Sequence, residues 1–207
     1  YLVLLRFLTI VLPLATYPYL IRVLGAELYG RLMWAWAVSH LLVVFVKFGS
    51  DQVAVKYISQ NRECRSSQCL TFSFVTYLRA SLLIITMVLF CFLINHIPKL
   101  KENADMLYSF LALVMCESLV PMWYFQGLEK MKFTAIIVAS IKMLFSIFVF
   151  VFVKDPADAY LVPKLYFFSS ALSLVVSYFF IFKVYEIRFL SCSWGELKVF
   201  MTESFMI

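Results

Sequence analysis

Four ionisable side chains lie inside otherwise apolar stretches of this 207-residue chain: Arg6, Arg79, Glu117 and Lys142. A charge near the centre of a bilayer costs about 2.5 to 3.5 kcal/mol on insertion scales, so such residues are rare and face a bundle interior or water. Three of the four are cations, which leaves an excess of positive charge. The chemistry that this set predicts is electrostatic binding of an anion inside a membrane.

Two roles are open for Glu117. It would either pair with Arg79 or Lys142 as a structural ion pair, or exchange its negative charge for H⁺ or Na⁺ during a transport cycle. Pro121 follows one turn later and has no backbone N–H, so it is expected to loosen the helix beside Glu117. Apart from such a coupling ion, the sequence predicts no cofactor.

Small and hydroxyl-bearing residues share helical faces with these charges. At about 100° per residue, four stretches each carry a polar stripe: Ala135, Ala139, Lys142 and Ser146; Tyr166, Ser170, Ser173 and Ser177; Thr76, Arg79 and Thr86; Arg6, Thr9, Pro13 and Tyr17. Similar stripes form where membrane helices pack closely, which leaves an interhelical seam as the alternative. Charges in three of the stripes favour a hydrated cavity.

The elements that must position these residues are membrane-spanning helices. Hydrophobic residues make up 64% of the chain and charged residues 14%, whereas about a quarter of an average soluble domain is charged. A spanning helix needs roughly 20 apolar residues, and six stretches qualify: Leu2 to Leu24, Leu28 to Phe48, Leu70 to Ile94, Met106 to Phe125, Phe133 to Val153 and Tyr160 to Phe182. The predicted fold class is therefore an all-α integral membrane protein with a six-transmembrane-helix lobe.

Lysine and arginine predict the orientation of this lobe, since cytoplasmic connections carry more of them. The connections after the second, fourth and sixth spans hold nine basic residues, and those after the first, third and fifth hold six. We therefore expect a cytoplasmic N-terminus. In the second connection, Ser50 or Asp51 is expected to cap a short helix. Its apolar residues Ala54, Tyr57 and Ile58 would lie along the inner leaflet, unless the segment is a plain solvated loop.

The remaining composition narrows the function. A net charge of +6 is explained by membrane topology, so nucleic acid is not an expected partner. The five cysteines are odd in number and lie mostly in or beside apolar runs, which predicts reduced thiols and no metal site. His40 and His96 have no carboxylate at a useful sequence spacing. Trp34, Trp36, Trp123 and Tyr124 lie near predicted helix ends, where most are expected to be interfacial aromatic residues, with sugar stacking as the alternative.

The segment Tyr17 to Gly30 joins the first two spans and contains Pro18, Arg22, Gly25, Glu27 and Gly30. Both glycines are expected to let the backbone reverse. Its amino-acid sequence resembles the signature of bacterial polysaccharide biosynthesis membrane proteins, the Wzx-type flippases of O-antigen and related repeat units. The residues that carry this resemblance are Pro-Tyr-Leu-Ile-Arg-Val-Leu-Gly-x-Glu-x-Tyr-Gly. Phe48-Gly49 and the stretch from Trp123 to Met131, which contains Gln126, Gly127 and Glu129, resemble two further motifs of this family.

The resemblance implies a superfamily whose members have two six-helix lobes around a central cavity. Residues 1–198 would then be the N-terminal lobe and residues 199–207 the truncated start of the next lobe, so a C-terminal lobe is missing. The implied cargo is an undecaprenyl-pyrophosphate-linked oligosaccharide, moved across the bacterial inner membrane without enzymatic chemistry, with membrane lipids and other polysaccharide assembly proteins as partners. We expect Arg6, Arg79 and Lys142 to attract the cargo, and Pro13 and Pro18 to act as hinges.

Two other functions compete with this reading. A cation-coupled drug antiporter of the same fold would favour a negatively lined cavity, which the excess of intramembrane cations disfavours. A membrane-embedded polysaccharide polymerase or acyltransferase would need acid, base or nucleophilic groups near a lipid-linked sugar, usually in a large external loop. The external connections predicted here, around His96 to Asp105 and Lys154 to Asp158, are short.

Overall fold

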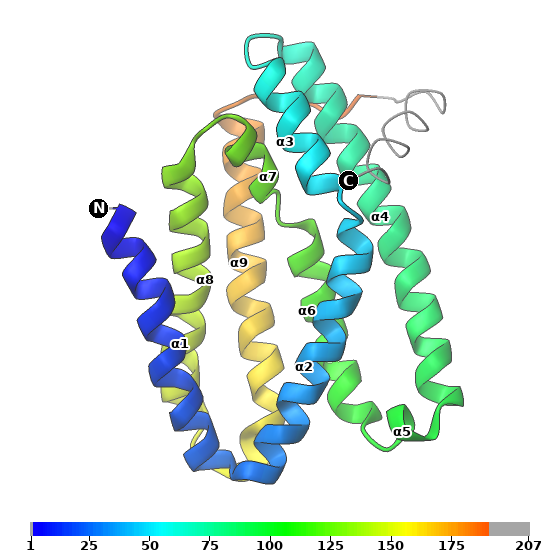
Figure 1. Cartoon of the computed structure of the whole chain (residues 1–207), viewed down its shortest axis with the longest axis vertical. Coiled ribbons are helices and arrows are strands. Elements are labelled where there is room, and N and C mark those ends of the chain that lie inside the picture. Colours follow the sequence, from blue (N-terminus) through cyan, green and yellow to red (C-terminus); the bar gives the residue numbers. More distant parts are fainter. Residues whose placement is uncertain (1, 191–207) are drawn as a thin grey trace.

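The chain folds into a bundle of helices that run back and forth between two ends (Figure 1). The computed structural model describes residues 2–190, with the side chains of all of these except residues 2–6 and 8. Within that part there are helices and connecting segments but no strand. The predicted boundary at residue 198 and the segment 199–207 lie outside the described residues.

Nine α-helices and one 3₁₀ helix make up the described chain, in the order α1 Leu2–Leu24, α2 Ala26–Lys47, α3 Ser50–Gln60, α4 Arg65–His96, α5 Pro98–Lys101, α6 Ala104–Leu119, α7 Met122–Gly127, α8 Met131–Phe152, η1 Pro156–Tyr160 and α9 Leu161–Lys183. Helices α3 and α7 lie at one end of the bundle, and α5 and the α1–α2 turn lie at the other (Figure 1). The connections therefore alternate between the two ends.

Five segments of the described chain are long and apolar enough to cross a membrane: Ala26–Lys47, Arg65–His96, Ala104–Gly127, Met131–Phe152 and Pro156–Lys183. The described side chains of α1 add a shorter apolar helix, Thr9–Leu24. These lengths match the roughly 20 residues that a helix needs to span a bilayer. The predicted all-α membrane class is confirmed, and the protein is a multi-pass membrane protein.

The fourth predicted span is not one continuous helix. Helix α6 ends at Leu119 and α7 begins at Met122, with Val120 in extended conformation between them. Pro121 has no N–H, and the N–H of Met122 donates to the carbonyl of Val120 at 3.0 Å rather than to a residue four positions earlier. The proline therefore breaks this span, a stronger effect than the loosening that the sequence predicted.

The first helical hairpin turns at one glycine. Gly25 has φ 79° and ψ 160°, a region that is essentially restricted to glycine. Gly30 was also expected to help the reversal, but this expectation is wrong, because Gly30 lies inside helix α2. From the Gly25 turn, α1 and α2 diverge toward the opposite end of the bundle (Figure 1).

The predicted short helix after the second span is confirmed as α3, but its surroundings differ from the prediction. Its N-cap is Gly49 at φ 68°, while Ser50 is already helical and donates its hydroxyl hydrogen to the carbonyl of Lys47. Ala54 and Ile58 are fully buried, in a core cluster that includes residues of α7. The apolar face of α3 thus packs inside the protein and does not lie on the leaflet.

Candidate functional site

Two adjoining chambers lie inside the helix bundle, and both are lined by Lys142 of α8 and Tyr166 of α9. The smaller chamber, of about 60 Å³, is mostly apolar and is lined by Pro13, Tyr17, Leu20, Leu32, Met33, Trp36, Phe110, Lys142, Phe145, Ser146, Val162, Pro163 and Tyr166. The larger, of about 310 Å³, is lined by Lys47, Asp51, Glu117, Val120, Met122, Trp123, Gln126, Val138, Ile141, Lys142, Tyr166 and Ser170. We call them the apolar chamber and the polar chamber.

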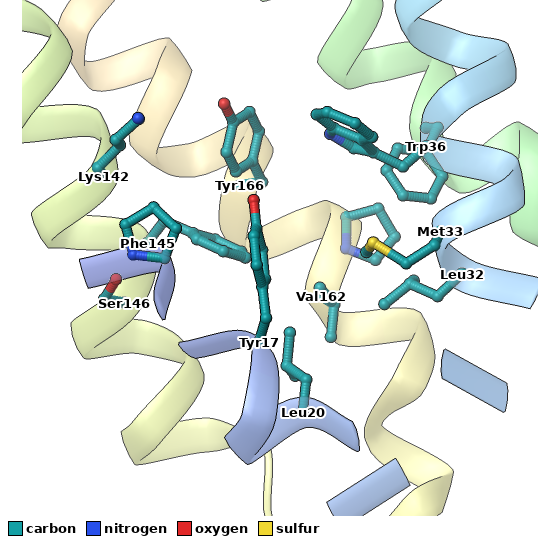
Figure 2. A pocket seen from close by; sticks show the side chains of 13 residues that line it. Tyr17, Leu20, Leu32, Met33, Trp36, Lys142, Phe145, Ser146, Val162 and Tyr166 are labelled. Atoms are coloured by element: carbon teal, nitrogen blue, oxygen red, sulfur yellow. The ribbon is translucent and has the colours of Figure 1, made fainter. Parts of the chain in front are cut away.

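Aromatic side chains from five helices line the apolar chamber. The ring of Tyr17 on α1 stands between Phe145 of α8 and Met33 of α2, and its hydroxyl points toward Tyr166 of α9 (Figure 2). Trp36 lies on the far side, and the Lys142 amine reaches up beside Tyr166 (Figure 2). Trp36, which was predicted to be an interfacial residue, therefore lies in the wall of this chamber.

The polar chamber carries two lysines and two carboxylates. Lys47 lies at the end of α2, Asp51 in the first turn of α3, Glu117 near the end of α6 and Lys142 in the middle of α8. Their formal charges cancel, which differs from the cationic lining that the sequence predicted. Within the described part of the chain, neither lysine has a carboxylate oxygen within 4 Å, whereas both carboxylates have cationic or ionisable partners.

Arg79 lies behind the polar chamber and not in it. Its side chain is 2% exposed and forms an ion pair with Asp51. The guanidinium also donates to the hydroxyl of Ser50 at 3.0 Å from two nitrogens and to the carbonyl of Ser118 at 3.1 Å. Arg79 on α4 thereby joins the start of α3 to the end of α6. The predicted pairing of Arg79 with Glu117 is wrong.

Glu117 has a different neighbour from the two that were considered. The Nδ1 atom of His40 lies 3.8 Å from its Oε1 atom, and the His40 ring stacks on Trp36 with centroids 4.9 Å apart. The expectation that His40 lacks a carboxylate partner is therefore wrong, since folding brings together residues on α2 and α6. This pair places an imidazole beside a chamber carboxylate.

Lys142 contacts α1 across the bundle. Its Nζ atom donates to the carbonyl of Thr9 at 2.8 Å, and one turn below, the hydroxyls of Ser146 and Thr16 are hydrogen bonded at 2.9 Å. The predicted stripes on these helices are thus in part an interhelical seam. The side chain of Arg6, predicted for the same site, lies outside the described residues.

Two of the motif regions named above, the α1–α2 turn and the segment that contains α7, lie at opposite ends of the bundle (Figure 1). Arg22 and Glu27, beside the Gly25 turn, are exposed and line neither chamber. Gln126 of α7 lines the polar chamber. Glu129, just beyond it, has φ 56° and pairs with Arg62 at 2.5 Å.

Gly127 allows α3 and α7 to approach closely. A Cβ atom added at this position would lie 2.6 Å from the Cβ atom of Ile58 and 3.2 Å from the carbonyl oxygen of Val55. Trp123 and Tyr124, predicted to be interfacial residues, are 2% and 0% exposed and belong to the core around this contact. The α3–α7 unit therefore forms a packed wall of the polar chamber.

Sequence reasoning missed Lys47, Asp51 and His40 as site residues. Lys47 and Asp51 were counted with a connection because they flank the Phe48-Gly49 turn, where Phe48 and Gly49 both have positive φ. That turn was the available signal, because it ends α2 at Lys47 and starts the helix that carries Asp51. Among the described residues, no group of three His, Cys, Asp or Glu side chains could hold a metal ion.

The fold is that of a multi-pass helical membrane protein with a polar chamber inside its helix bundle. The family model described as "Polysaccharide biosynthesis protein" matches residues 1–207, and the chain belongs to this family. The resemblance deduced from Tyr17 to Gly30 is thereby confirmed.

One curated relative is the "Putative O-antigen transporter" of Escherichia coli (strain K12), which is 27% identical over 147 residues. The matched stretch covers 71% of this chain and 35% of that protein, so the match spans about a third of the relative's length. No solved structure matches the chain significantly.

Proposed function

We propose that this chain is the six-helix N-terminal lobe of a flippase that moves an undecaprenyl-pyrophosphate-linked oligosaccharide across the bacterial inner membrane. The repeat unit of O-antigen or a related polysaccharide would be the cargo. In this proposal the N-terminus is cytoplasmic, a C-terminal lobe completes the transport path, and other polysaccharide assembly proteins and membrane lipids are partners. The family membership and the name of the curated relative support this cargo class.

The observation that carries the proposal is the polar chamber inside an apolar bundle. Intramembrane ionisable residues are costly and are associated with substrate or ion pathways. Lys47 and Lys142 offer ammonium groups without a carboxylate within 4 Å in the described part. Counting Arg79 behind Asp51, cations exceed carboxylates around this chamber, which favours an anionic ligand such as a pyrophosphate.

Within the proposed cycle, the chamber residues divide into two kinds. Lys47 and Lys142 contact the pyrophosphate, and Gln126 and Ser170 offer hydrogen bonds to it or to the first sugar. Glu117, whose carboxylate lies 3.8 Å from His40, is the coupling site in this proposal, where exchange of H⁺ or Na⁺ changes the charge beside the phosphate. Arg79 positions Asp51 and does not touch the cargo, which revises the role predicted from the sequence.

The test is transport by full-length protein reconstituted in vesicles, with a fluorescent lipid-linked oligosaccharide whose outward movement is measured by quenching. Lys47→Gln and Lys142→Gln should each lower the rate, and the double variant should abolish it. Lys164→Gln is the matched control, because Lys164 is an exposed lysine outside both chambers. Normal transport by the double variant at normal protein level would refute the proposal.

The same preparation separates the competing functions. A drug antiporter would move a cationic dye under a proton or sodium gradient and leave the oligosaccharide in place. A polymerase or acyltransferase would change the mass of the lipid-linked sugar, because it makes or breaks a covalent bond. Translocation of an unaltered oligosaccharide distinguishes a flippase from both.

A further inference from the structure

The contact between Lys142 and α1 occurs at a specific point of the backbone. The Nζ atom of Lys142 donates to the carbonyl oxygen of Thr9 at 2.8 Å. In an α-helix, that carbonyl accepts a hydrogen bond from the N–H four residues later. The residue four positions after Thr9 is Pro13, which has no N–H to donate. The lysine therefore supplies a donor where proline removes one.

This placement matters energetically in an apolar surrounding. A backbone carbonyl without a donor is costly in hydrocarbon, because no water replaces the missing bond. Helix α1 nevertheless runs unbroken through Pro13 and Pro18 from Leu2 to Leu24. The ammonium of Lys142, on α8, contributes to this continuity by donating a hydrogen bond to the carbonyl of Thr9 on α1. The Thr16–Ser146 hydrogen bond joins the same two helices one turn below.

The same ammonium lines both chambers. Lysine has three donor hydrogens, and the described part of the chain offers it no carboxylate within 4 Å. A phosphate oxygen that enters the polar chamber is a stronger acceptor for an ammonium than a neutral carbonyl, because the negative charge of the phosphate adds a Coulombic attraction to the hydrogen bond. An anion in the chamber and the carbonyl of Thr9 therefore compete for Lys142.

We infer that Lys142 is a positioning residue for α1 as well as an anion contact, and that a phosphate-bearing ligand releases α1 by drawing Lys142 away from Thr9. The inference deepens the proposed function and rests on it for the nature of the anion. Release would free the part of α1 that precedes Pro13 to move relative to α8. Occupancy of the polar chamber would in this way be transmitted to α1, which borders the apolar chamber.

The test measures the position of α1 without any transport. Spin labels on cysteines replacing Ile10 of α1 and Ile84 of α4, both exposed, report their distance in full-length protein that lacks the native cysteines. A second pair, at Ile147 of α8 and Ile84, is the control and should not change. Lys142→Met should broaden the Ile10–Ile84 distance distribution. Pro13→Ala should restore the narrow distribution in the Lys142→Met protein, because alanine returns the N–H for the carbonyl of Thr9.

Inorganic pyrophosphate is the ligand probe, compared with sodium chloride at the same ionic strength. It should shift the wild-type Ile10–Ile84 distribution toward that of Lys142→Met and leave the Lys142→Met protein unchanged. A Lys142→Met distribution identical to wild type, no restoration by Pro13→Ala, or no response of wild type to pyrophosphate would each overturn the inference. Because no translocation is measured, such a result beside normal oligosaccharide transport would refute the α1 contact and leave the proposed function intact.

Discussion

The ion pair between Arg79 and Asp51 predicts unequal effects of removing its two members. Arg79 is 2% exposed, whereas the side chain of Asp51 is 37% exposed at the wall of the polar chamber. Removing Asp51 leaves a buried guanidinium without a counter-charge. Removing Arg79 leaves a carboxylate that water in the chamber can reach. We therefore expect Asp51→Ala to destabilise the protein more than Arg79→Met.

The magnitudes follow from the contacts of each side chain. Stranding a charge by removing one member of a buried ion pair costs about 3 to 5 kcal/mol, which is the expectation for Asp51→Ala. Arg79→Met leaves the carbonyl of Ser118 without this donor, and an unsatisfied buried acceptor costs about 1 to 3 kcal/mol. The double variant should resemble Arg79→Met, because the charge that Asp51 balanced is then absent. The expected coupling energy is therefore about −3 to −5 kcal/mol, equal in size to the cost of Asp51→Ala alone and larger than the roughly 0.5 to 3 kcal/mol seen for most residues in contact.

The assay is unfolding of the full-length protein in detergent micelles, followed by tryptophan fluorescence for the wild type, both single variants and the double variant. The surface pair of Arg62 and Glu129 is the matched control, since exposed ion pairs contribute little to stability. Equal losses for Asp51→Ala and Arg79→Met, or additive losses in the double variant, would refute the reasoning. Either outcome would mean that Arg79 is compensated by groups other than Asp51.

Of three further predictions, two concern glycine positions in the backbone and the third concerns a surface charge. Gly25→Ala should destabilise the protein by about 1 to 3 kcal/mol in thermal unfolding, because Gly25 has φ 79°, whereas Gly30→Ala in the helix interior should be neutral or slightly stabilising. Gly127→Ala should cost about 1 to 3 kcal/mol by overpacking, and Ile58→Ala should not rescue it, because the 2.6 Å contact involves the Cβ atom that alanine retains. The hydrogen bond that Arg62 donates to Glu129 lowers the pKa of the Glu129 carboxyl. The stabilisation from this ion pair is therefore fully present above the ordinary glutamate pKa and is lost as the pH falls through the lowered pKa. Unfolding temperatures measured toward acidic pH should show a small loss that Glu129→Gln lacks.

The sequence predicted the helices well because the length of an apolar run is a local property. The bounds predicted for the first span, Leu2 to Leu24, agree with α1, and those for the sixth, Tyr160 to Phe182, differ from α9 by one residue at each end. The fourth predicted span failed at Pro121, because hydropathy measures whether a stretch is apolar and not whether its backbone hydrogen bonds are continuous. Pro13 and Pro18, by contrast, lie in a continuous α1.

The site was harder to predict because its contacts join residues far apart in the sequence. Glu117 meets His40 from another helix, and Arg79 meets Asp51, which hydropathy assigned to a connection. Helical phase correctly grouped Lys142 with Ser146, but it could not identify what faces them. The net charge that a cavity presents depends on which charged side chains are paired. This pairing follows from tertiary contacts, which a single sequence does not reveal.

The two intramembrane cations whose side chains are described share a structural role that explains why they are tolerated. Each donates to a backbone carbonyl near a proline: Lys142 to Thr9, four residues before Pro13, and Arg79 to Ser118, three residues before Pro121. Interrupted backbone in a membrane persists only where protein or water satisfies its polar groups. A cation that donates to a carbonyl near a proline is therefore placed beside the interruption in the backbone hydrogen bonds, where a change in its bonding alters the local backbone. In Lys142, the charge that suggests a ligand and the charge that holds α1 belong to the same ammonium group. Of Lys142 and Arg79, only Lys142 lines the polar chamber.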